Sequence, residues 1–62
     1  KNEIKINYSN YYTNIKSNVF DNTGKFMFSS NKDIINVNYL PNGIYFIEVY
    51  IDNKRYKARF IK

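Results

Sequence analysis

The chain has 62 residues and a mass of 7.5 kDa, which allows one small domain with a single hydrophobic core. It contains neither cysteine nor histidine, which excludes disulfides, thiolate or imidazole metal sites and a histidine general base. The formal net charge is +5, and seven Tyr and five Phe side chains are the main material for a core, so the composition argues against an enzyme and predicts no cofactor and no metal.

Apolar and polar residues alternate along most of the chain, which is typical of half-buried β-strands. The first predicted strand covers residues 3–8, with its apolar side chains at even positions. A polar segment over 9–14, interrupted by Tyr11 and Tyr12, separates it from a second predicted strand over 15–20.

The clearest turn in the first half covers residues 21–24. Gly24 can adopt positive φ there, and the Asp at the first position can accept a bond from the backbone. The chain is expected to return as a strand over 25–29, with Phe26 and Phe28 on one face.

A further strand is marked by Ile35, Val37 and Tyr39, whose side chains alternate with asparagines. The second strong turn follows at 40–43, where a proline presets φ and Gly43 suits a position with positive φ.

The segment 44–51 is apolar on both faces except at Glu48, and this predicts a central strand covered on each side. Asp52 and Asn53 tolerate left-handed geometry and predict a two-residue turn. Residues 54–61 then alternate between basic and apolar side chains, as a last strand.

A two-residue turn fixes the register of this last hairpin. One face is then apolar and expected in the core, through the pairs Val49–Tyr56, Ile47–Ala58 and Tyr45–Phe60. The other face contains the pairs Tyr50–Arg55, Glu48–Lys57 and Phe46–Arg59. We therefore expect Glu48 and Lys57 on the same face of the sheet. No stretch of ten residues has helical periodicity, so the domain is predicted to be all-β.

Catalytic chemistry finds little support in the sequence. There are five acidic residues: Glu3, Asp21, Asp33, Glu48 and Asp52. Turn geometry explains Asp21 and Asp52, and nothing places two carboxylates across a cleft, as glycoside hydrolysis requires. The two glycines are too far apart for a phosphate-binding loop. The longest apolar run, residues 44–47, is too short to span a membrane, and no leader peptide is expected at residue 1.

Half of the basic residues lie in the last nine positions: Lys54, Arg55, Lys57, Arg59 and Lys62. Together with Phe46 and Tyr50 they permit a stacking platform with a cationic rim, as in proteins that bind single-stranded nucleic acid. A solvated strand whose lysines discourage edge-to-edge aggregation explains the same pattern, and we favour it because no RNA-binding signature accompanies the charge. An anionic membrane surface or lipopolysaccharide would also suit this stripe.

Exposed tyrosines could stack on sugars, but most tyrosines here fall on apolar stripes. Tyr8, Tyr39, Tyr45 and Tyr56 are expected in the core. Tyr11 and Tyr12 are expected to be exposed, and adjacent residues of a strand would point to opposite faces.

Three segments in order resemble the C-terminal sorting domain, type A, of the type IX (Por) secretion system of Bacteroidetes. The first is Val19–Phe20–Asp21–Asn22–Thr23–Gly24–Lys25, which matches an aromatic residue, then Asp or Asn, then x-x-Gly-Lys. The second is residues 40–49, which match Leu-x-x-Gly-x-Tyr before a β-rich run, and the third is the basic strand 54–62. The family usually opens with a Tyr-Pro-Asn-Pro-like segment, which is missing before Glu3. We therefore expect residues 1–62 to form one sorting domain that is trimmed or atypical at its N-terminal strand.

The resemblance implies a small Ig-like antiparallel β-sandwich of about six to seven strands. It implies a non-catalytic signal that directs a larger cargo protein through the outer-membrane translocon to the cell surface or the medium. The implied partners are the translocon, a shuttle protein, a sortase-like protease that removes the domain, and anionic lipopolysaccharide, but no nucleic acid. The alternative is a small basic β-barrel that binds single-stranded nucleic acid.

The candidate recognition residues are Gly24, Lys25, Gly43, Lys57, Arg59 and Lys62. The two glycines have an equally good explanation in their turns. The basic residues are the better candidates for direct contact, since core packing does not require them. We expect a free C-terminal strand, so that removal of residues 59–62 would abolish export and leave the domain folded.

Overall fold

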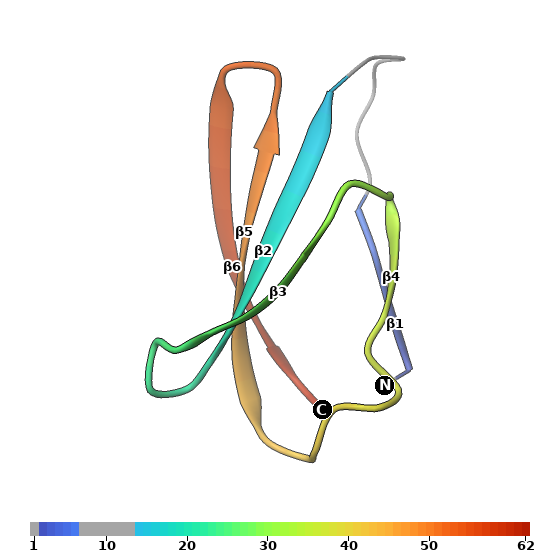
Figure 1. The fold of residues 1–62 in the computed structure, drawn as a ribbon, viewed down its shortest axis with the longest axis vertical. Coiled ribbons are helices and arrows are strands. Elements are labelled where there is room, and N and C mark those ends of the chain that lie inside the picture. Colours follow the sequence, from blue (N-terminus) through green and yellow to red (C-terminus); the bar gives the residue numbers. More distant parts are fainter. Residues whose placement is uncertain (1, 7–13) are drawn as a thin grey trace.

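The computed structural model describes residues 2–6 and 14–62 (Figure 1), and this part of the chain contains strands and no helix. The strands are β1 (Glu3–Lys5), β2 (Ile15–Asp21), β3 (Phe26–Ser30), β4 (Ile34–Asn36), β5 (Ile44–Ile51) and β6 (Lys54–Ile61). They form a two-stranded sheet, β1-β4, and a four-stranded sheet in the order β3-β2-β5-β6, with all pairs antiparallel. The predicted all-β sandwich is confirmed.

The core lies between the two sheets, on the inner face of β2, β5 and β6. Its buried hydrophobic residues are Val19, Ile35, Val37, Leu40, Tyr45, Ile47, Val49 and Phe60. The rings of Tyr45 and Phe60 stack with their centroids 5.3 Å apart. In Figure 1 the small sheet stands beside the large one and faces only part of it. The small sheet therefore covers one face of the large sheet and leaves the other face to solvent.

The register of the last hairpin is confirmed at every predicted pair, from Tyr50 opposite Arg55 to Tyr45 opposite Phe60. Asp52 adopts a φ of 56° and turns the chain between β5 and β6. Glu48 lies opposite Lys57, so both side chains are on the same face, as expected.

The expectation that Phe26 and Phe28 share a face is wrong. Phe28 lies opposite Val19 while Phe26 lies opposite Phe20, and the register shifts between these two pairs. Such a β-bulge places an extra residue, Met27, in β3 and reverses which side chains face the core. Phe28 consequently packs against the core, whereas Phe26 is 53% exposed on the opposite face.

The predicted strand through Ile35, Val37 and Tyr39 ends earlier than expected, at Asn36. The Asn36 side-chain oxygen accepts a bond from the Asn38 amide at 2.8 Å, and this local turn competes with the strand ladder. Tyr39 lies within the turn that the Leu40 amide closes on the Val37 carbonyl and is 65% exposed, so its predicted place in the core is wrong.

Two further burial predictions are wrong, since the small sheet is short and covers only the inner face of the large one. Tyr56 faces inward on β6 but is 51% exposed, and its neighbour Ala58 is also exposed. β5 is central within its sheet, but its outward side chains, Ile44, Phe46 and Tyr50, are exposed, so it is covered on one face only. The predictions for Tyr8, Tyr11 and Tyr12 concern residues outside the described part of the chain.

Candidate recognition surface

The uncovered face of the four-stranded sheet combines aromatic and basic side chains. Successive side chains of a strand point to opposite faces, so this surface consists of the positions that alternate with the core residues. We call it the outer face, and its members are Lys16, Asn18, Phe20, Phe26, Ser29, Ile44, Phe46, Glu48, Tyr50, Arg55, Lys57, Arg59 and Ile61.

A row of aromatic rings crosses the outer face from strand to strand. Phe26 is the cross-strand partner of Phe20, Phe20 that of Phe46, and Phe46 that of Arg59. The Phe20 and Phe26 rings meet edge to face with centroids 5.9 Å apart. Phe46 is 42% exposed. The sheet thus presents a continuous apolar row that ends at a guanidinium.

The charge of the outer face is positive. Glu48 is its one acidic member, and its carboxylate lies 3.9 Å from the Arg55 guanidinium and accepts a long bond, 3.5 Å, from the Tyr50 hydroxyl. Lys57 lies directly opposite Glu48 on the neighbouring strand. The outer face thus has four basic residues and one acidic residue, and the acidic residue already pairs with Arg55. This surface therefore attracts anionic groups.

A hollow of about 270 Å³ opens in the middle of the outer face. It is lined by Phe20, Gly24, Phe46, Ile47, Glu48, Lys57 and Ala58. Two of the predicted recognition residues, Gly24 and Lys57, therefore lie at one depression although they are far apart in sequence. Its lining combines two aromatic rings with the Lys57 ammonium and the Glu48 carboxylate, and the latter is paired with Arg55, so the hollow suits an apolar side chain next to an anionic group.

The turn beside this hollow is built by Asp21. Its carboxylate accepts bonds from the Thr23 hydroxyl at 2.6 Å, the Thr23 amide at 2.9 Å and the Lys25 amide at 3.0 Å. These bonds lower the pKa of Asp21 from its ordinary value of 3.8, and the bond from the Thr23 hydroxyl has the largest effect. Gly24 has a φ of 89°, which a residue with a side chain rarely adopts. Local geometry thus explains Gly24, and it leaves Lys25 exposed at the surface.

The other two predicted residues, Gly43 and Lys62, hold the end of the domain together. Their backbones exchange both bonds, at 3.2 and 2.8 Å. The Lys62 ammonium also donates to the carbonyls of Asn38 at 3.2 Å and Leu40 at 3.0 Å. Gly43 has a φ of 158°, positive as expected and close to extended backbone. Lys62 therefore fastens the end of β6 to the segment between β4 and β5, so the C-terminal end of the chain is held by more contacts than the sequence predicts.

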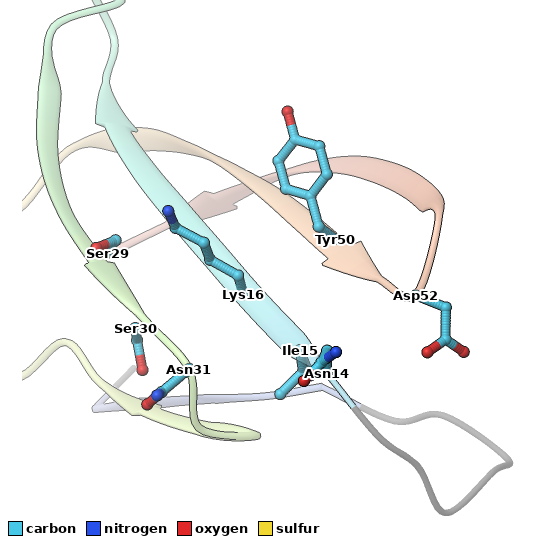
Figure 2. A pocket seen from close by; sticks show the side chains of 8 residues that line it. All are labelled: Asn14, Ile15, Lys16, Ser29, Ser30, Asn31, Tyr50 and Asp52. Atoms are coloured by element: carbon cyan, nitrogen blue, oxygen red, sulfur yellow. The ribbon is translucent and has the colours of Figure 1, made fainter.

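A second hollow, of about 620 Å³, lies at the opposite end of the sheet (Figure 2). Its lining residues are Asn14, Ile15, Lys16, Ser29, Ser30, Asn31, Tyr50 and Asp52. Figure 2 shows Lys16 and Tyr50, which are cross-strand partners, projecting from the same side of the sheet. The amides, hydroxyls, Lys16 ammonium and Asp52 carboxylate of this lining can bind polar groups. Within residues 2–6 and 14–62, no three acidic side chains gather as a metal site would need.

Sequence reasoning identified Phe46 and Tyr50 beside the basic strand but missed Phe20, Phe26 and Lys16. The hairpin β5-β6 can be aligned through its turn, whereas β2 and β5 are distant in sequence and their register has no local signal. The alternation also predicts the wrong face for Phe26, because it does not reveal the bulge in β3.

In its described residues the domain consists of strands and turns, and aromatic and basic side chains gather on its outer face. The chain matches the model of the secretion system C-terminal sorting domain family over residues 1–62. No curated protein and no solved structure gives a significant match. No helix in the described part of the chain is long and apolar enough to cross a membrane.

The chain belongs to this family, the C-terminal sorting domains of type IX secretion. Domains of the family are sorting signals and in general non-catalytic, and they interact with the type IX secretion machinery. A protein that carries such a signal is secreted or exported to the cell surface.

Proposed function

We propose that residues 1–62 form a non-catalytic signal that directs a larger cargo protein through the type IX outer-membrane translocon. The cargo enters the periplasm first, and the machinery there recognises the folded domain through its outer face. The domain then passes to a shuttle protein, and a sortase-like protease removes it before the cargo is attached to anionic lipopolysaccharide.

The observation that carries this proposal is the outer face itself. A domain of this size has little apolar surface to spare, yet it leaves Phe26, Phe46 and Tyr50 at least 36% exposed on one side of a sheet. Exposed aromatic residues gathered on one face are typical of interaction sites. The basic residues between them, Lys57 and Arg59 among the predicted contacts, favour an anionic partner.

The test is export of a periplasmic reporter fused to residues 1–62 in a bacterium with a working type IX system. We expect the fusion in the medium or on the surface, and retention in a strain that lacks the translocon. Retention of the fusion in the competent strain would contradict the proposal.

A second set of fusions tests the outer face. The variant Phe26→Ser/Phe46→Ser/Arg59→Ser should be retained, because it removes the ends of the aromatic row and its cation. The matched control Tyr39→Ser/Ile34→Ser/Lys32→Ser removes two exposed apolar residues and one cation away from the outer face, and it should be exported. Circular dichroism of the purified domains verifies that each variant is folded. Equal export of both variants would contradict recognition of the domain through its outer face.

The alternative, a closed barrel for nucleic acid, has less support. The four-stranded sheet ends at β3 and β6 rather than closing on itself. Aromatic and basic residues on a sheet do suit single strands, so oligonucleotide binding that weakens steeply with salt would favour this alternative.

A further inference from the structure

We propose that strand β6 is an open docking edge for an extended partner segment in which acidic and apolar residues alternate. The inference deepens the proposed function and rests on it, since it names the chemistry of the segment by which the secretion machinery would hold the domain.

The two edges of the four-stranded sheet differ in a way that favours β6. β3 has five residues and contains the bulge at Met27, which disrupts regular pairing. β6 has eight residues in unbroken register with β5, and no other described strand pairs with it. Natural sheets protect edges by bulges and short strands, so β6 is the edge that is left able to accept another strand.

The hydrogen bonds between Gly43 and Lys62, just beyond the last pair of the hairpin, show which backbone groups of β6 point outward. Gly43 and Lys62 exchange both their bonds. In an antiparallel ladder such pairs alternate with pairs that exchange none, and the register continues without a break from Ile61 to Lys54. The backbone groups of Arg55, Lys57 and Arg59 therefore point away from β5, toward the open edge.

The side chains of the same strand specify the partner. Arg55, Lys57 and Arg59 stand on the outer face, whereas Tyr56 and Ala58 stand on the inner face and are exposed. In a strand added at this edge, every second residue would lie beside the three cations on the outer face, and the residues between them would lie beside Tyr56 and Ala58 on the inner face. Acidic residues opposite the three cations and apolar residues opposite Tyr56 and Ala58 give favourable pairs on both faces.

A second copy of the chain does not fit this edge. Antiparallel pairing of β6 with itself would align positions 55, 57 and 59 with one another across the new ladder. Like charges directly opposite each other are destabilising, so the edge repels its own copy while it remains open to an acidic segment.

The test uses the purified 62-residue chain and the peptide Glu-Val-Glu-Val-Glu-Val-Glu, with Lys-Val-Lys-Val-Lys-Val-Lys as the control. Amide hydrogen exchange by NMR reads the edge residue by residue. In the free domain the amides of residues 56, 58 and 60 should be protected and those of 55, 57 and 59 should exchange fast. The acidic peptide should slow exchange at 55, 57 and 59 by about tenfold or more, and the basic peptide should not. Unchanged exchange at these three amides, or equal effects of both peptides, would overturn the proposal.

Charge reversal provides the matched comparison. The variant Lys57→Glu/Arg59→Glu should bind the acidic peptide about tenfold more weakly, while Lys5→Glu/Lys32→Glu, with the same change in net charge, should lose much less because salt screens distant charges. A chain synthesised with an N-methyl group on the Lys57 amide keeps every charge and should still lose binding. Retained binding by the methylated chain would mean that the peptide uses the face and not the edge, and would overturn the proposal.

Export separates this inference from the function on which it rests. Reporter fusions of the unaltered chain test the sorting signal. If the unaltered fusion is exported and Lys57→Glu/Arg59→Glu is exported equally well, the docking edge is wrong although the sorting function stands. If the unaltered fusion is itself retained, the sorting function fails whatever the peptides show.

Discussion

Ser17 gives the sharpest test of the packing described here. It lies on the inner face of β2, opposite Val49 and Ser30, and its exposed fraction is 0%. Its hydroxyl has no hydrogen-bond partner within the described part of the chain. Because folding removes this hydroxyl from water without replacing its bonds, we expect Ser17→Ala to stabilise the domain.

The size of the effect follows from two opposing contributions. A buried hydroxyl without a partner costs about 1–3 kcal/mol in protein mutants. The space left by one oxygen atom, roughly 10 Å³ at about 24 cal/mol per Å³, costs only a few tenths of a kcal/mol. The net stabilisation expected for Ser17→Ala is therefore about 1 kcal/mol, which raises Tm by about 4–8 °C in a domain of this length.

Thermal and urea unfolding followed by circular dichroism measure the change. Ser29→Ala is the control, because Ser29 is exposed on the neighbouring strand and its removal should change stability by less than about 0.5 kcal/mol. If Ser17→Ala lowers Tm while Ser29→Ala leaves it unchanged, the hydroxyl has a favourable role in the fold and the reasoning is wrong.

Three other predictions follow from the same structure. Phe60→Ala removes the buried ring stacked on Tyr45 and should cost about 3–5 kcal/mol, out of a total free energy of unfolding of roughly 3–9 kcal/mol. Urea titration should therefore find much of the variant protein unfolded, and a midpoint near that of the unaltered chain would contradict this. Gly24→Ala should cost about 1–2 kcal/mol in chemical denaturation, because φ is 89° there, and an unchanged midpoint would count against strain. The folded pKa of Asp21 is lowered, so its stabilising effect is complete above the ordinary value of 3.8 and is lost as pH falls below it. Melting curves between pH 6 and 2 should therefore fall less steeply for Asp21→Asn, and parallel curves would refute the assignment.

The buried ring of Phe60 also changes how the end of the chain should be studied. Removing residues 59–62 would delete this core residue together with Lys62, whose ammonium holds two carbonyls. The truncated domain is then expected to unfold, contrary to the prediction made from sequence. Loss of export in that truncation would not distinguish recognition from folding, whereas single substitutions at Lys57 or Arg59 do.

The local sequence is sufficient for the β5-β6 hairpin and for the turn at Asp21. A two-residue turn at Asp52 and Asn53 leaves one register that buries Tyr45 and Phe60 together, so alternation predicts every pair. The Asp21 turn is equally local, since its bonds reach no further than Lys25. In both cases the interacting residues are close in sequence, and residue type fixes the geometry.

Tertiary structure alone decides which apolar stripes are covered. Tyr56 and Phe60 occupy equivalent alternating positions on β6, yet the first is half exposed and the second is buried, because the segment between β4 and β5 lies at the end of β6 where Phe60 stands. The bulge in β3 brings Phe26 to Phe20 on the outer face, and the non-local pairing of β2 with β5 adds Phe46 to that row. Alternation predicts that a residue faces one side of a sheet, but whether that side meets a second sheet, solvent or a partner depends on the lengths and positions of strands elsewhere in the chain.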